Sequence, residues 1–251
     1  MKLRILFLSG LAVVIIFIIY LITLDKKIYY IALGDSLAIG QNPYGSTGYG
    51  YSDYVSNYLD QKELLDFYTK GFATSGQRVI DLIQDIEENR KIEVNDKSLG
   101  LKTALIKADV VTISIGANDL FTQMGINDMT FNLEHKDKAY NYIDEINENL
   151  DKLLKIIRIY CKEDIIIVGY YNPLAKLSSH YSRELEPLFL YINEKTKEIA
   201  NHHHAYFIDI YDIFKENPEY LPNPLDIHPS SAGYEVIATL ITSLIEREII
   251  N

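Results

Sequence analysis

The chain from Tyr29 to Gly40 reads YYIALGDSLAIG. Its first five residues form an apolar run rich in aromatic and β-branched side chains, which predicts a buried β-strand. The run breaks at Gly34 and places Asp35 and Ser36 at the carboxyl end of the strand. Ligands of open α/β sheets bind at that end, so Ser36 is a candidate nucleophile. The alternative is an ordinary turn, because Gly, Asp and Ser all favour turns.

The rest of the chain alternates between further strand patterns and helix patterns. Strands are predicted at 66–70, 109–115, 164–169 and 206–210. Amphipathic helices are predicted at 51–65, 79–88, 99–108, 139–161 and 184–201, with a last helix ending at Ile249. The segments 89–98 and 126–138 are polar and are expected to be surface connections. Five strands separated by helices predict an α/β fold with a parallel sheet.

Composition narrows the range of functions. The 251 residues are 48% apolar and 24% charged, as in globular domains. The net charge of −11 argues against a nucleic-acid partner, because phosphate recognition needs clustered Lys and Arg. The single cysteine, Cys161, excludes an intrachain disulfide and is expected to be a core residue.

The N-terminal segment differs from the rest of the chain. Lys2 and Arg4 precede the uncharged stretch 5–24, which is long enough to span roughly 30 Å as a helix. No signal-peptidase site follows it, so we expect residues 1–27 to form an uncleaved signal anchor and residues 28–251 an exported domain. The alternative is a cleaved signal that releases a secreted domain.

Two further stretches place polar groups after predicted strands. Gly71–Arg78 is a small-residue loop leading into a helix, where free backbone N–H groups and Gly76 can approach a reacting group. Gly116–Asp119 follows the clearest strand, and the Asn118 carboxamide can donate to a developing oxyanion. The alternatives are helix caps: Thr74 or Ser75 for the first helix, and Asn118 or Asp119 for the second. For Asp119 we favour the cap.

The stretch Leu225-Asp226-Ile227-His228-Pro229 adds a candidate base. Two residues apart in an extended segment, Asp226 and His228 project to the same side. The carboxylate can then fix the imidazole tautomer and leave the other ring nitrogen free. The same segment also suits a helix start, with Pro229 and Ser230 opening the last helix.

Other candidates carry weaker signals. Tyr44 and Tyr49, in the loop after Ser36, and Tyr171, after the fourth strand, are candidate substrate-binding residues. The run His202–His204 closes a predicted helix, where cations are favourable. A metal site there would need further ligands that the sequence does not locate, so we predict no metal ligands.

The four stretches together resemble the conserved blocks of the GDSL or SGNH hydrolase family, in order and at similar spacing. Within it, the chain is most similar to the membrane-anchored, lysophospholipase-L1-like bacterial group. The resemblance implies a three-layer α/β/α sandwich with strand order 2-1-3-4-5. It also implies Ser36 as nucleophile, His228 as base and Asp226 as the residue that orients it. The implied oxyanion hole comprises the Ser36 and Gly76 N–H groups and the Asn118 side chain. No cofactor is implied.

We therefore expect a serine esterase that cleaves lysophospholipids or small acyl esters, held at the cell membrane with its catalytic domain on the extracytoplasmic face. One alternative is an O-acetylesterase or acyltransferase acting on cell-envelope glycans. A second, of another class, is a non-catalytic membrane-tethered envelope protein.

Overall fold

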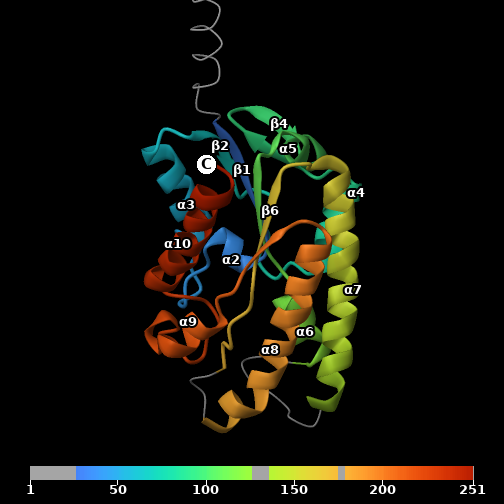
Figure 1. Cartoon of the computed structure of the whole chain (residues 1–251), viewed down its shortest axis with the longest axis vertical. Helices are drawn as coiled ribbons and strands as arrows, with labels where there is room; N and C mark the ends of the chain where they lie inside the picture. The colour runs from blue at the N-terminus through green and yellow to red at the C-terminus, as the bar shows by residue number, and fades with distance from the viewer. Residues whose placement is uncertain (1–26, 126–135, 175–178, 251) are drawn as a thin grey trace, which may run out of the picture.

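A five-stranded parallel sheet forms the centre of the protein, whose computed structural model describes residues 27–125, 136–174 and 179–250 (Figure 1). The strand order is β2-β1-β5-β6-β7. The strands are β1 Ile28–Gly34, β2 Leu65–Thr69, β5 Val110–Ser114, β6 Asp164–Val168 and β7 Tyr206–Ile208. This confirms the predicted α/β class, and the order equals the expected 2-1-3-4-5 when only the sheet strands are numbered.

Helices cover both faces of the sheet (Figure 1). One face carries α3 Tyr51–Gln61, α9 Tyr211–Glu216 and α10 Ser231–Glu248. The other carries α4 Val79–Glu87, α5 Leu101–Lys107, α6 Ala117–Gln123, α7 Lys136–Tyr160 and α8 Ser179–His202. Two short elements, α2 Ser36–Ile39 and the 3₁₀ helix η2 Pro218–Tyr220, belong to the connections.

Alternation along β1 shows why both faces are apolar. Ile31 and Leu33 pack in the core under α4 and α7, whereas Tyr30 and Ala32 pack in the core under α3 and α10. Successive side chains of a strand point to opposite faces, so a strand covered on both sides must be a continuous apolar run. Such runs were the signal that predicted the strands.

Polar segment 89–98 is more ordered than expected. Instead of an irregular surface connection it contributes to an antiparallel hairpin, β3 Lys91–Val94 paired with β4 Lys97–Gly100. The turn residues Asn95 and Asp96 both have positive φ, 51° and 59°. Such a two-residue turn matches the twist of hairpin strands, and Asn and Asp tolerate it better than most residues. The hairpin extends the structure at the amino-terminal edge of the sheet, away from α2 (Figure 1).

Within the described part of the chain, no helix combines the length and apolarity needed to cross a membrane. The predicted anchor at 5–24 lies outside the described residues, as does most of the polar segment 126–138.

Candidate active site

Ser36 lies where β1 gives way to the short helix α2. The turn depends on Gly34, whose φ is +116°. A Cβ at Gly34 would lie 1.8 Å from the Ser114 carbonyl oxygen on neighbouring β5, so no other residue fits there. The chain therefore turns sharply and presents Ser36, the first residue of α2, at the carboxyl edge of the sheet.

His228 lies beside Ser36 although 192 residues separate them. Its Nε2 is 2.8 Å from the Ser36 Oγ, and its Nδ1 is 2.7 Å from the Asp226 Oδ1. An ionised carboxylate only accepts hydrogen bonds, so Nδ1 donates and Nε2 is left to accept from the hydroxyl. The structure thus brings together the three residues that the sequence singled out, with the donor and acceptor roles that proton transfer requires.

One carboxylate oxygen holds both the ring and the backbone of His228. The Asp226 Oδ1 also accepts from the His228 backbone N–H, at 2.8 Å. The hydroxyl of Tyr171 donates to the Ile227 carbonyl at 2.6 Å, and its ring stacks on Phe214. The segment 226–228 is therefore held by the Asp226 carboxylate and by the Tyr171 hydroxyl.

Bonds from the C-terminal region also fix the loop after Ser36. The Tyr234 hydroxyl donates to the Gln41 carbonyl at 2.7 Å, and the Asn223 side chain donates to the Pro43 carbonyl at 2.8 Å. Ser230 caps α10 as predicted, since its hydroxyl accepts from the Gly233 N–H. An early and a late segment of the described chain are thus tied together around the site.

The predicted oxyanion-hole residues form a second group at the same edge. The Asn118 Nδ2 donates to the Gln77 carbonyl at 3.1 Å, which places this amide beside the loop containing Gly76. Gly76 has φ +77°, a left-handed conformation that favours glycine. Ser36 opens α2, where its N–H has no helical carbonyl to bond. The three residues come from three different segments, namely the start of α2, the loop before α4 and the start of α6.

The capping roles differ from those expected. Helix α6 begins at Ala117 with Gly116 as its N-cap, so neither Asn118 nor Asp119 caps it. Asp119 instead accepts from the N–H of Val79, the first residue of α4, at 3.0 Å. Nor does Thr74 or Ser75 cap α4, because its N-cap is Arg78. Asp119 thereby fixes the α4 end of the Gly76 loop against the first turn of α6, which also carries Asn118.

The Asp35 side chain stabilises the turn that carries Ser36. Its Oδ1 accepts from the Leu37 N–H at 3.0 Å and from the Ser114 hydroxyl at 3.2 Å. Burial raises the pKa of this carboxyl from 3.8 to about 7, against the lowering effect of those bonds. The sequence suggested only a turn residue here; its role as cap and inter-strand link depends on packing.

Asp35 should make stability depend on pH. Between 3.8 and about 7 the folded chain holds a proton that the unfolded chain has lost. The free energy of unfolding should therefore fall as pH rises through this window, by an amount on the order of a few kcal/mol. The variant Asp35→Asn keeps an acceptor oxygen but does not titrate, so it should lose this dependence.

Urea unfolding of both chains at several pH values between 4 and 8 measures this difference. Burial also raises the pKa of Asp119, to about 6. The variant Asp119→Asn therefore measures the separate contribution of Asp119 to the pH dependence. Parallel curves for the parent chain and Asp35→Asn would contradict the expectation.

An apolar pocket adjoins the site formed by Ser36, His228 and Asp226. It is lined by Asp35 and Leu37, the sequence neighbours of Ser36, and by Ile227, the neighbour of His228. Its apolar walls also include Ile115, Ala117, Leu120, Phe121, Tyr170, Tyr171, Pro173 and Phe189. Of the three candidate substrate-binding tyrosines, only Tyr171 lines it. Tyr44 is 76% exposed, and Tyr49 packs edge-on against Tyr54.

Among the described residues, one cluster of three side chains has metal-ligating geometry, namely Asp151, His202 and His203. It does not include the residues around Ser36. The buried position of Cys161 agrees with its expected core role.

Comparison with known proteins decides the family. The family model of the GDSL-like lipases and acylhydrolases matches residues 32–236. The chain belongs to this family. The matched region begins within β1 and ends within α10, so it includes all four motifs. As a GDSL-like protein, the chain is an ester hydrolase.

Relatives and solved structures agree with this GDSL assignment. The chain is 25% identical over 227 residues to the uncharacterized protein YpmR of Bacillus subtilis, covering 89% of this chain and 83% of YpmR. The lipase Lip_vut3 from a goat rumen metagenome superposes with a TM-score of 0.66 at 22% identity, over 85% of this chain and 95% of that one. A variant of Axe2, an acetyl-xylooligosaccharide esterase from Geobacillus, gives 0.62 at 23% identity, over 90% and 98%. These likenesses show a shared fold.

Proposed function

We propose that this GDSL hydrolase cleaves carboxylic esters through an acyl-enzyme formed on Ser36. The observation that carries the proposal is the continuous hydrogen-bond path from Ser36 through His228 to Asp226, with links of 2.8 and 2.7 Å. Such a path activates a hydroxyl that is otherwise a weak nucleophile at neutral pH. Both Ser36 and His228 are buried, so the transfer takes place shielded from bulk water.

The first half-reaction follows from these contacts. As the Ser36 Oγ attacks the ester carbonyl, His228 Nε2 takes its proton and the carbonyl oxygen becomes an oxyanion. Collapse of this intermediate breaks the bond to the alcohol, which leaves with the proton from Nε2. Water then repeats the sequence on the acyl-enzyme and releases the acid. Asp226 stabilises the imidazolium that forms in each half.

The oxyanion forms near the donors at the sheet edge. In this proposal it accepts hydrogen bonds from the Ser36 and Gly76 N–H groups and from the Asn118 Nδ2. The Asn118 Nδ2 donates to the Gln77 carbonyl, which keeps this amide close to the Gly76 loop. Donors fixed in advance stabilise charge without reorganising during the reaction.

Asn118→Ala should lower kcat by about 10²–10³, because one oxyanion donor is lost. KM should change little, since the ground-state carbonyl needs this donor less than the oxyanion does. Initial rates on a chromogenic ester give both constants. Asn57→Ala, at an exposed position on α3, is the matched control. An unchanged kcat would remove Asn118 from the hole.

The apolar pocket supports an ester with an apolar acyl group, as in lysophospholipids or small acyl esters. Apart from the Asp35 carboxyl, the lining of this pocket offers no charged group to an acyl chain. Rates on p-nitrophenyl esters from acetate to palmitate, followed by lysophosphatidylcholine, test this choice. A rate that rises with chain length supports a lysophospholipid. A rate confined to acetate rejects it.

A second candidate is deacetylation, or acetyl transfer, on an envelope glycan. The observation in its favour is the likeness to Axe2, described as an acetylxylan esterase, whose catalytic mutants change one Ser, one His and one Asp. Those are the residue types that meet here. Release of acetate from an acetylated glycan, compared with transfer to an added glycan acceptor, separates the esterase from the transferase.

We also propose that residues 5–24 anchor the enzyme in the cell membrane, with the domain 28–251 on the extracytoplasmic face. The length and lack of charge of this stretch support the anchor, whereas the flanking charges do not set its orientation, because Lys2 and Arg4 precede it and Lys26 and Lys27 follow it. Membrane fractions washed with alkaline carbonate should retain the chain, and protease added to intact spheroplasts should digest it. Recovery in the culture medium would instead support the cleaved form.

A further inference from the structure

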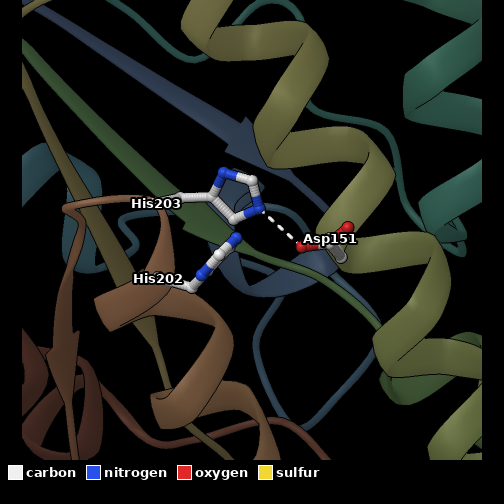
Figure 2. Close-up of side chains that lie close together, drawn as sticks. All are labelled: Asp151, His202 and His203. Atoms are coloured by element: carbon white, nitrogen blue, oxygen red, sulfur yellow. Dashed lines mark hydrogen bonds and ion pairs between the residues drawn. The ribbon is translucent and has the colours of Figure 1, made fainter.

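Three potential metal ligands from two helices meet on the α7–α8 side of the sheet. His202 is the last residue of α8, His203 follows it, and Asp151 lies on α7. Figure 2 shows both imidazoles reaching toward Asp151. One ligand atom from each side chain can be chosen so that all lie within 4.8 Å of one another.

We propose that Asp151, His202 and His203 bind a divalent transition-metal ion of the zinc class. Two imidazole nitrogens and a carboxylate oxygen are a donor set that such ions accept, with a fourth position left for water. The ion would link the middle of α7 to the C-terminal end of α8. It is a separate site from the esterase group and does not depend on the proposed function.

Binding of a metal ion would replace the hydrogen bond between His203 and Asp151. The His203 Nε2 is 2.7 Å from the Asp151 Oδ1, so Nε2 carries the bridging hydrogen in the metal-free protein. The ion takes the place of this hydrogen, and the proton moves to Nδ1 or to solvent. Donor atoms around tetrahedral zinc lie about 3.3 Å apart, given bonds of about 2.0 Å. On binding, donor atoms that now lie within 4.8 Å of one another would move to that spacing.

The backbone that carries the two histidines is fixed. The Arg158 guanidinium donates from Nε to the His203 carbonyl at 2.9 Å and from a terminal nitrogen to the His204 carbonyl at 2.7 Å. His204, with φ 54°, ends the helix in the left-handed region. These bonds direct the cationic group of Arg158 to carbonyls, although it comes from the same helix as Asp151. The His203 side chain is only 11% exposed, which further limits its rotation.

Charged groups of both signs lie near the cluster. The groove next to the cluster, between α7 and α8, contains the carboxylates of Asp144, Glu148 and Asp151. Its lysines are Lys152 and Lys195, and Lys195 forms an ion pair with Glu198 at 2.9 Å. Apart from the ligand Asp151, the groove has two carboxylates and two lysines, so the donor set itself, rather than the surrounding charge, would hold the ion.

The place of the cluster in the fold indicates a structural ion. The end of α8 leads directly into β7, so the two histidines lie at the amino-terminal edge of the sheet. Ser36 lies at the carboxyl edge. The ion would therefore stabilise the packing of α7 on α8 without contacting an ester.

The test uses the full chain, produced without a histidine tag and stripped of metal with EDTA. Zinc is titrated by calorimetry, and Co²⁺ is added separately because its visible absorption reports tetrahedral coordination. His202→Ala is the central variant, since it leaves the His203–Asp151 hydrogen bond in place. His204→Ala is the matched control, a neighbouring histidine outside the cluster.

We expect one Zn²⁺ per chain, with affinity falling more than about 100-fold in His202→Ala and unchanged in His204→Ala. Saturating zinc should raise the Tm of the parent chain by about 5–10 °C but not that of His202→Ala. Esterase activity should be the same in both variants without metal. Equal zinc affinity in the parent chain and His202→Ala, or no binding in the parent chain, would overturn the proposal. Binding abolished only by His228→Ala would place the ion at the esterase group and overturn it as well.

Discussion

Replacing Ser36 with alanine is expected to lower kcat on p-nitrophenyl esters by a factor on the order of 10⁶, comparable with the loss of a serine nucleophile elsewhere. His228 and Asp226 would remain in place but would have no hydroxyl to activate. The substitution removes one oxygen atom at a buried position, so the fold should persist. A fluorophosphonate probe, which labels activated serines, should label the parent chain and not the variant.

Ser46→Ala is the matched control, because Ser46 is exposed in the loop after Ser36. It should keep both labelling and activity. Full esterase activity in Ser36→Ala would refute the proposed nucleophile. A folded parent chain that neither reacts with the probe nor cleaves any ester would support the non-catalytic alternative, in which the motifs mark the fold alone.

The second large effect is expected at Asp226. Asp226→Ala should lower kcat by about 10⁴, because the imidazole loses the group that fixes its tautomer and stabilises its charge. Asp226→Asn should retain more activity than the alanine variant. The reason is that one oxygen, Oδ1, accepts from both the ring and the backbone of His228. An amide oxygen can occupy the same place and preserve the geometry, although it lacks the charge.

Kinetics of the two variants beside Asp60→Ala, an exposed aspartate at the end of α3, give the comparison. The ratio of kcat between the asparagine and alanine variants measures how much of the effect is orientation. An equal loss of kcat in Asp226→Asn and Asp226→Ala would contradict this expectation. It would mean that the amide introduced at position 226 turns its nitrogen, and not its oxygen, toward His228.

The centre of the sheet was predictable because β1, β5 and β6 are covered on both faces and leave continuous apolar runs in the sequence. The stretch before Ser36 is the clearest example. The hairpin around Asn95 was missed for the converse reason: the side chains of both its strands are exposed or half-buried and none is buried, so no apolar run marks it. Its turn also uses Asn and Asp without the glycine that usually signals one.

The reactive residues were predictable from local spacing, since Asp226 and His228 are near neighbours in the chain. Hydrogen bonds between residues that only the packing of helices brings together were not predictable from the sequence. Asp119 bonds the Val79 N–H across 40 residues, and Asp151 meets His203 across 52. Neither pair leaves a periodic signal, so the sequence suggested a cap for the first and located no partner for the histidine run.

The separation of 192 residues between Ser36 and His228 bears on the order in which the protein matures. During synthesis the chain presents its serine early, while the base and its carboxylate are made only near the end. Until the segment before α10 docks against the loop after β1, the serine is an ordinary alcohol. A chain truncated before Asp226 would therefore carry the nucleophile without its chemistry. Activity consequently reports that the last part of the domain has folded onto the first.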